Sequence, residues 1–287
     1  MARARKRPTQ QALFDERGRP AVRNGKRLAK RRGKKRGRKP KGPRSSEPHK
    51  RRPELKRSYP VHVVLRVVDA IGSMRKRHMY RALREASISV ALRELTYARE
   101  GAFRIVHVSV QRNHIHLLVE ASDKTALSRG MQSFQISAAK HLNRAVSVEA
   151  RGLTAKQRRS LAGRRAMAAR RRGTVFPDRF HQVIITSPKQ ARNTLAYVLN
   201  NWRKHREHQA PFARTWNVDP YSTGYQFDGW KQREHADVLW DKPAAFDPLI
   251  VYLPKTWLLR EGWRKHGLIG FAEVPSARTL GIAAAQA

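Results

Sequence analysis

Between residues 58 and 207, short β-rich runs alternate with longer amphipathic stretches. Short segments rich in β-branched side chains predict strands. They are Tyr59–Val68, Phe103–Val110, His114–Glu120 and Phe180–Ile185. Stretches in which apolar residues recur every three or four positions follow most of them and predict helices. The order strand, helix, strand, strand, helix, strand, helix predicts a ferredoxin-like (RRM-like) α+β fold, an antiparallel sheet with helices packed on one face.

Two of the predicted helices precede the last strand. The first lies between Met79 and Ala98, and the second follows the third strand. In each of them apolar residues return at helical spacing and would form one buried face. These residues are Leu83, Ile88, Leu92 and Leu95 in the first helix, and Leu127, Met131, Phe134, Ala138, Leu142 and Ala145 in the second.

The third helix has a well-marked start. Ser187 can cap it, Pro188 suits its first turn, and Gln190 completes a capping box. We predict that this helix continues to about His205. An i, i+3, i+4, i+7 series of apolar residues forms its buried stripe. The members of the stripe are Leu195, Val198, Leu199 and Trp202.

The composition changes on both sides of this region and predicts three parts. Residues 1–57 contain 24 Lys and Arg against 4 Asp and Glu and few apolar side chains, which predicts a disordered basic N-terminal arm. Residues 58–207 form the predicted catalytic domain, and residues 151–172, with nine Lys and Arg and no acid, are a basic insertion within it. Residues 208–287 are rich in aromatic and turn residues without a clear period, so we interpret them as a C-terminal appendage.

The net charge predicts a polyanionic partner. The chain has 62 Lys and Arg against 21 Asp and Glu, a formal net charge of +41. Such a charge favours nucleic acid, because each neutralised phosphate releases a counterion. A membrane is the other common polyanion, but no stretch resembles an amphipathic anchor, and His62 and Arg66 interrupt the apolar run Val61–Val68. We therefore expect no membrane partner.

Two further features bear on location and chemistry. The chain has no cysteine, which excludes disulfides, thiolate chemistry and cysteine zinc sites. The opening run MARARKRPTQ lacks a hydrophobic signal region. We therefore expect a cytoplasmic, nucleoid-associated protein.

The run HIHLLVE carries the first candidate chemistry. Residues Gln111-Arg112-Asn113 link it to the preceding strand as a short hairpin. Alternation along a strand places His114 and His116 on one face, about 7 Å apart along the strand, and their apolar neighbours on the core face. Two imidazoles can share one transition-metal cation, and Mg²⁺ or Mn²⁺ would be bound with help from substrate phosphate oxygens. On this pattern alone, two unconnected histidines remain an alternative.

The third helix carries the second candidate. Tyr197 and Asn201 lie nearly opposite its buried stripe and one turn apart, so they are neighbours on the helix surface. A tyrosine in this place can meet a substrate, or it can be a surface residue that packs on a neighbouring strand. A tyrosine nucleophile suits phosphodiester chemistry in which the product stays bound, but its phenol needs assistance from a metal or a base. Asn201 could supply an oxygen ligand beside the two histidines.

Three runs, NHIHLLVE, VFPDRFH and ARNTLAYVLNNWRKH, resemble the single-tyrosine HUH transposases of the insertion sequence 200-like group, with the REP-associated tyrosine transposases as the closest branch. The resemblance implies that His114 and His116 bind a divalent metal, that Tyr197 is the nucleophile and that Asn201 stands at the third ligand position. It also implies a ferredoxin-like fold, single-stranded or hairpin DNA as the substrate and a homodimer in several relatives. The implied product is a 5′-phosphotyrosine with a free 3′-hydroxyl group. The run DPYSTGYQFDGW, residues 219–230, resembles a downstream element of some relatives.

Four further residues are candidates for DNA contact. They are Arg179 and His181 in the run DRFH, and Arg203 and Lys204 at the end of the third helix. Each of them could instead be an ordinary residue of a basic surface.

Taken together, the residues and the resemblance predict a metal-dependent tyrosine transposase that cleaves and rejoins single-stranded DNA, in transposition or in processing of repeat hairpins. The alternative is a catalytically inactive, basic nucleic-acid-binding protein with a ferredoxin-like fold. That protein would display aromatic residues on its two central strands. A replication initiator or relaxase would need a different motif order or a helicase region, for which 287 residues leave no room.

Overall fold

The computed structural model describes residues 22–23, 26–27, 51–96, 102–150, 160, 171–234, 243 and 246–274. By its internal contacts the chain divides into two units, Met1–Ser45 and Ser46–Ala287. In the first unit the short strands β1 (Val22–Arg23) and β2 (Lys26–Arg27) pair antiparallel. Most of the predicted arm and nearly all of the predicted basic insertion lie outside the described residues. No described helix is both long and apolar enough to cross a membrane.

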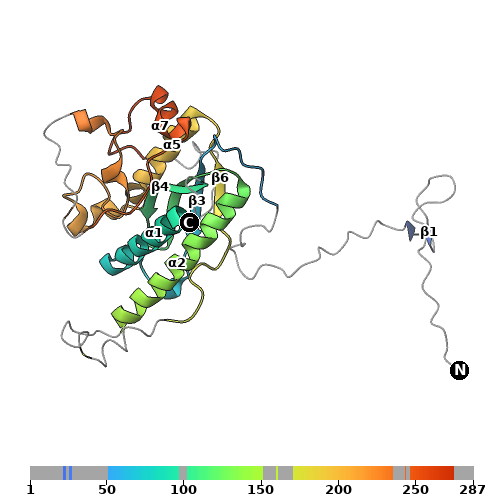
Figure 1. Cartoon of the computed structure of the whole chain (residues 1–287), viewed down its shortest axis with the longest axis horizontal. Helices are drawn as coiled ribbons and strands as arrows, with labels where there is room; N and C mark the ends of the chain where they lie inside the picture. Colours follow the sequence, from blue (N-terminus) through green and yellow to red (C-terminus); the bar gives the residue numbers. More distant parts are fainter. Residues whose placement is uncertain are drawn as a thin grey trace. The chain divides into compact units, whose positions relative to one another are not determined.

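The second unit is built on a four-stranded antiparallel sheet (Figure 1). Its strands are β3 (Val61–Arg66), β4 (Phe103–Val110), β5 (His114–Ala121) and β6 (His181–Ile184). They lie in the order β4-β5-β3-β6, with the β4–β5 hairpin that the sequence predicts. This order is the ferredoxin-like one, and the predicted α+β fold class is confirmed.

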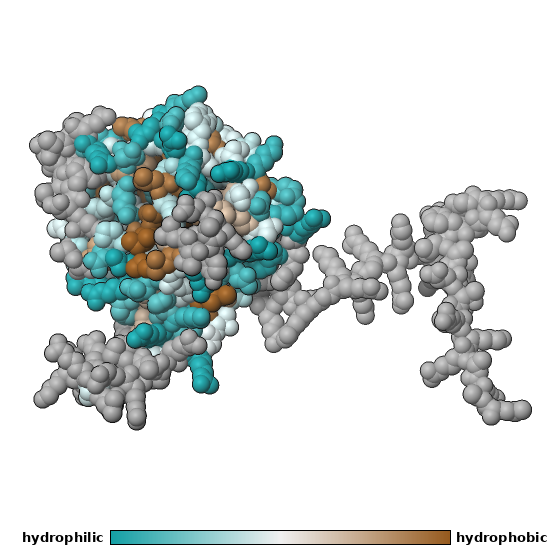
Figure 2. Space-filling model, viewed as in Figure 1, coloured by the Kyte–Doolittle hydropathy of each residue, from teal (hydrophilic) through white to brown (hydrophobic). Residues whose placement is uncertain are grey.

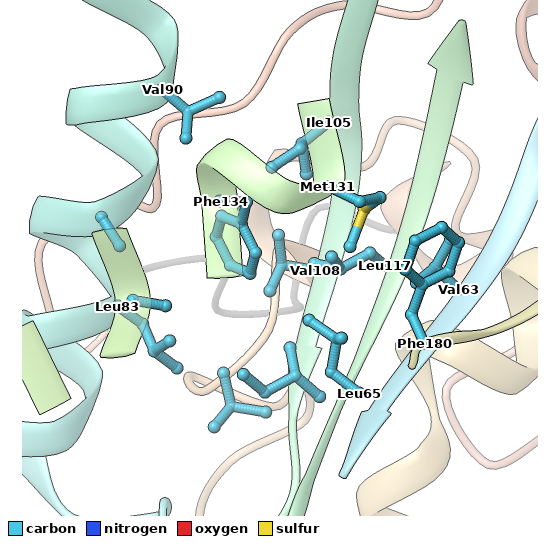
Figure 3. Close-up of a cluster of buried hydrophobic side chains, with 14 of the residues drawn as sticks. Val63, Leu65, Leu83, Val90, Ile105, Val108, Leu117, Met131, Phe134 and Phe180 are labelled. Carbon is cyan, nitrogen blue, oxygen red and sulfur yellow. The ribbon is translucent and has the colours of Figure 1, made fainter. Parts of the chain in front are cut away.

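One face of the sheet is covered by two helices, α1 (Arg77–Thr96) and α2 (Lys124–Ala150), which lie side by side in Figure 1. Their apolar side chains meet those of the strands in the main core. Figure 3 shows part of this core, with Val63, Leu65 and Leu117 from the sheet facing Leu83, Met131 and Phe134 from the helices. The predicted apolar face of α2 is confirmed, because five of its six members are buried and Ala145 packs partly buried against them.

The predicted apolar face of α1 is wrong in part. The helix buries Met79, Leu83, Ala86 and Val90, whereas Leu92 is 57% exposed. Leu92 comes nine residues after Leu83, which at ~100° per residue places it on the opposite side of the helix. The side chain of Leu95 lies outside the described residues.

The third helix, α5 (Pro188–Leu199), differs from the prediction in its location, because it packs on the other face of the sheet. Its buried stripe meets Val106 and Leu118 in a second core, and all four predicted members of the stripe are buried. The Ser187 hydroxyl oxygen accepts a hydrogen bond from the Gln190 amide, as predicted for the cap. The Gln190 side chain accepts from the Thr186 amide at 2.9 Å, so this half of the capping box reaches one residue further back.

The predicted end of the third helix also needs correction. Helix α5 ends at Leu199, and a separate turn, α6 (Asn201–Lys204), continues the chain. Asn200 lies between them with φ −103° and ψ 12°, outside the helical region. Its side chain donates to the carbonyls of Gly270 and Glu273 at 2.9 and 2.8 Å, so a tertiary contact occupies the residue at the break.

Residues 219–230 protect the open edge of the sheet. Tyr221 and Thr223 exchange backbone hydrogen bonds with Val110 and Val108 of β4, at 3.0 and 2.9 Å. An uncovered edge strand would present unpaired backbone groups to other chains. Arg75 holds this segment through two hydrogen bonds to the Asp219 carboxylate, at 2.8 and 2.9 Å. The downstream element therefore has a structural role in the sheet.

The remaining elements are short. Helix α7 spans Trp257–Arg260. Single 3-10 turns occupy Asp69–Ile71, Glu207–Gln209, Pro211–Ala213, Gly224–Gln226, Lys231–Glu234 and Gly262–His266. On the face shown in Figure 2, hydrophobic side chains gather in small groups among hydrophilic ones.

Glu120 connects the sheet to residues 255–256 from the chain beyond it. Its side chain is 2% exposed and receives hydrogen bonds from Arg104 and from the backbone amides of Lys255 and Thr256, the latter two at 2.8–3.0 Å. A buried carboxylate is stable only when its oxygens are paired in this way.

We predict that Glu120→Gln lowers the free energy of unfolding by about 3 kcal/mol, because the variant leaves the Arg104 charge buried without its partner. Urea unfolding followed by circular dichroism measures the effect. Glu85→Gln is the matched control, since its ion pair with Arg84 spans 3.9 Å on the surface and should contribute little. Equal stability of the two variants would contradict this role of Glu120.

Candidate functional site

Two buried histidines lie on the face of the sheet away from α1 and α2. His62 of β3 and His116 of β5 are 1% and 2% exposed, and these strands are neighbours. Their rings are nearly parallel, with centroids 5.2 Å apart. The Nε2 atom of His62 lies 3.0 Å from Nδ1 of His116, which makes a hydrogen bond between the two imidazoles.

His114 joins this pair at the start of β5. Its ring centroid is 4.7 Å from that of His116 and 5.3 Å from that of His205, which follows α6. Its Nδ1 atom lies 2.7 Å from Oδ1 of Asn113. The predicted placement of His114 and His116 on one strand face is confirmed, since Ile115 and Leu117 between and beside them enter the main core.

Tyr197 approaches the same histidines from α5. Its ring meets His116 and His62 edge-on, with centroids 5.4 and 5.9 Å apart. Lys204 of α6 donates a hydrogen bond to the phenol oxygen at 3.3 Å. The tyrosine is half-buried. Residues from β3, β5, α5 and α6 therefore form one cluster around the phenol.

Asn201, the predicted third ligand, is 1% exposed. Within the described part of the chain neither atom of its amide has a hydrogen-bond partner, and the same is true of Nε2 of His116. Buried polar atoms are rarely left unpaired, because each costs about 1–3 kcal/mol. Two of the three predicted ligands thus carry unused polar atoms.

The donor set fits a divalent cation in type. Two imidazole nitrogens and an amide oxygen are ligands that Mn²⁺ and related ions accept. No group of three His, Cys, Asp or Glu that could hold a metal occurs among the described residues. The predicted set contains two histidines and an asparagine, so the protein would depend on Asn201 or on substrate oxygens for further ligands.

Burial keeps the histidines neutral. Desolvation, with a smaller effect from His181 and His114, lowers the pKa of His62 to about 3. Desolvation, followed by His205 and nearby cations, lowers the pKa of His114 to about 3, and it lowers the pKa of His116 well below 6.5. Neutral imidazoles retain the lone pair that a metal ligand requires.

The four predicted DNA-contact residues differ in their exposure and contacts. Lys204 is exposed and contacts Tyr197. Arg203 donates to the carbonyl of Asn217 at 3.1 Å and lies over the Trp202 ring, so part of its guanidinium serves packing. His181 lies on β6 opposite Val64, and Arg179 is half-buried just before that strand.

Sequence reasoning did not assign His62 or His205 to the site. Both are ordinary single histidines in the sequence, and His62 lies 52 positions before His114 by their numbers. Only the β3–β5 register brings His62 to His116. Alternation within Val61–Arg66 does place His62 on the face opposite Val61 and Val63, which was the one available signal.

The fold and the cluster define an α+β domain in which buried histidines on one sheet face meet a tyrosine from a covering helix. Residues 60–157 match the family model described as Transposase IS200 like, which confirms over this segment the resemblance drawn from the sequence motifs. Among solved structures, the chain is similar to one described as the REP-associated tyrosine transposase bound to a REP hairpin. That similarity has 16% identity, a TM-score of 0.41, and coverage of 71% of this chain and 99% of that one. No curated protein matches the sequence.

The neutral histidines predict a loss of stability in acid. The native pKa is about 3 for His62 and His114 and, because of burial, about 4 for His107, against 6.5 in the unfolded chain. Above pH 6.5 their contribution is fully present. As the pH falls below 6.5, these histidines bind protons in the unfolded state but stay neutral in the native state. The free energy of unfolding therefore decreases progressively toward pH 3.

We expect the free energy of unfolding in EDTA to fall between pH 7 and pH 5, by at most about 1.4 kcal/mol per pH unit for each of these histidines. Urea titrations at several pH values measure the slope. His107→Gln, away from the tyrosine cluster, should reduce it. A stability that is constant from pH 7 to pH 5 would show that these rings are not neutral and buried.

Proposed function

We propose that the chain is a transposase-like endonuclease and strand-transferase for single-stranded DNA, with Tyr197 as its nucleophile. The observation that supports this most directly is the position of the Tyr197 phenol, which lies against His116 while Lys204 donates to its oxygen. A tyrosine in a purely structural role would not need a cation at its hydroxyl group and two neutral histidines at its ring.

The proposed reaction is a transesterification. The phenol oxygen of Tyr197 gives its proton to solvent water and attacks the scissile phosphorus, forming a 5′-phosphotyrosine bond. The bond from phosphorus to the 3′ oxygen breaks, and that oxygen takes up a proton to become a free 3′-hydroxyl group. The ammonium group of Lys204 stabilises the phenolate by a charge-assisted hydrogen bond. Attack by another 3′-hydroxyl group reverses the step and rejoins the DNA.

His114, His116 and Asn201 are the residues that would hold Mg²⁺ or Mn²⁺. When bound there, a divalent cation would polarise the scissile phosphate as a Lewis acid. The unpaired His116 nitrogen and Asn201 amide among the described residues support this assignment. Lys204, Arg203, Arg179 and His181 would contact the DNA backbone.

The proposed substrate is single-stranded or hairpin DNA. The net charge of +41 supports a nucleic-acid partner, since neutralisation of phosphates supplies affinity. The match of residues 60–157 to the IS200-like transposase family supports DNA as this partner. A homodimer and a cytoplasmic, nucleoid-associated location complete the proposal.

The alternative, an inactive nucleic-acid-binding protein, fits the sheet less well. Such a protein would offer aromatic rings on an open sheet face. Here the central strands β3 and β5 present His62, His116 and Leu118 on that face, and α5 packs against it. The face is built around a polar cluster and a helix.

Tyr197→Phe is expected to abolish the covalent protein–DNA adduct while hairpin binding stays within a few-fold of wild type, because only the attacking oxygen is lost. A hairpin oligonucleotide with a labelled strand and denaturing gel electrophoresis measure the adduct. Tyr225→Phe removes a hydroxyl group outside the site and should leave the yield unchanged. An adduct of normal yield in the Tyr197 variant would exclude this nucleophile.

His116→Ala is expected to slow cleavage by at least about 10-fold and to raise the manganese concentration needed for half-maximal rate, because a ligand is removed. His141→Ala, on helix α2, is the control and should behave as wild type. Cleavage by the wild-type protein that persists in EDTA would rule out the metal requirement.

A further inference from the structure

His62 has no role in the proposed reaction, although it is fully buried in the cluster. It is 1% exposed and contacts both His116 and Tyr197. A histidine hidden in this way costs solvation energy and is retained only when its ring makes a useful contact. Within the described residues its ring makes one hydrogen bond, between its Nε2 and Nδ1 of His116 at 3.0 Å, and its own Nδ1 has no partner.

Two neutral imidazoles at this distance share one proton in one of two ways. If Nε2 of His62 carries the proton, His116 accepts it at Nδ1 and carries its own proton at Nε2, where it cannot bind a cation. If Nδ1 of His116 carries the proton, His62 accepts it and Nε2 of His116 keeps a free lone pair. The second arrangement is the only one of the two in which His116 is a metal ligand.

We propose that His62 is a positioning residue, which accepts the Nδ1 proton of His116 and thereby holds that ring in the tautomer and orientation that present Nε2 to a divalent cation. This inference rests on the proposed metal site. Metal-binding histidines generally need such a partner at the other ring nitrogen, and a carboxylate or a carbonyl usually provides it. Here a second imidazole takes that place.

His114, the other predicted ligand, also has a hydrogen-bond partner at its Nδ1 atom. Nδ1 of His114 lies 2.7 Å from Oδ1 of Asn113, and an amide oxygen can only accept. The proton of His114 is therefore on Nδ1, and its Nε2 is unprotonated. Two different partners, Asn113 and His62, thus impose the same tautomer on the two candidate ligands.

The unpaired nitrogen of His116 agrees with this arrangement. Within the described residues, Nε2 of His116 has no hydrogen-bond partner, so nothing in that part of the chain competes for its lone pair. The rings are 18° from parallel, and their centroids lie 5.2 Å apart, nearly the full reach of a 3.0 Å contact between ring nitrogens, so the His62 nitrogen lies close to the plane of the His116 ring. A lone pair in that plane is correctly directed to receive the proton.

The experiment measures manganese binding to the full-length protein by electron paramagnetic resonance, without DNA, for wild type and four variants. His62→Leu removes the acceptor and should weaken Mn²⁺ binding by about 10- to 100-fold. His62→Gln keeps an oxygen acceptor near the same place and should restore most of the affinity. His107→Leu is the matched control, because His107 is also buried in the sheet but bonds to Thr223, at 3.1 Å. His116→Ala should abolish binding.

A second measurement reads the tautomer directly. In nitrogen-15 NMR of the metal-free wild type, His116 should carry its proton on Nδ1, and in His62→Leu this preference should be lost while thermal unfolding still shows a folded protein. Wild-type His116 protonated on Nε2 would overturn the proposal, even if His62→Leu fails to fold.

The outcomes separate this inference from the proposed function. If His62→Leu binds Mn²⁺ as tightly as wild type while His116→Ala does not bind, His62 has no positioning role and the metal site stands. If His116→Ala binds Mn²⁺ as tightly as wild type, the metal site itself is wrong and the inference falls with it. If His107→Leu weakens binding as much as His62→Leu, the effect belongs to the fold and the positioning role is overturned.

Discussion

The pairing of β3 with β5 at the centre of the sheet is the constraint on which the rest of the second unit depends. In this register Val64 lies opposite His116 and His62 opposite Leu118. Side chains alternate along a strand, so a slip of one residue would turn Ile115, Leu117 and Val119 of β5 out of the main core and its histidines into it. The apolar residues beneath α1 and α2 therefore fix the histidine face as firmly as they fix the core.

The histidine face of the sheet is covered only in part, which leaves its histidines in contact with Tyr197. Helix α5 covers part of it with Leu195 and Val198, while Tyr197 of the same helix, partly buried against this second core, reaches the histidines. Residues after 207 hold this layer in place. Asn200 bonds to the carbonyls of Gly270 and Glu273, and Glu120 receives the amides of Lys255 and Thr256. The stretch interpreted from the sequence as an appendage thus supplies hydrogen bonds that hold both α5 and the sheet.

The sequence predicted the sheet and its helices well, since those depend on local periodicity. It could not predict the face on which α5 packs, because an apolar stripe looks the same whichever sheet face receives it. The exposed Leu92 shows a similar limit, since the pattern offered two competing faces and only packing against α2 selects one. At the site, His114, His116 and Tyr197 were recognisable because they lie in dense local motifs. His62 is isolated in the sequence, and a cross-strand register has no local signature.

The cluster contains buried polar atoms that have no hydrogen-bond partner among the described residues. The Nε2 atom of His116 and the amide of Asn201 are buried without partners in the described part of the chain, at a cost of about 1–3 kcal/mol each. Around them Asn113 pairs with His114, His62 with His116 and Lys204 with Tyr197, while Nδ1 of His62 also has no partner among the described residues. The unpaired nitrogen of His116 lies beside Tyr197, and the unpaired amide oxygen of Asn201 lies on the turn that follows the tyrosine helix. Both atoms can offer a lone pair, so a bound cation would offset the cost of leaving them unpaired. A ligand that binds these atoms only in the native state would stabilise the fold by mass action. The same unpaired atoms would therefore contribute to both ligand binding and stability.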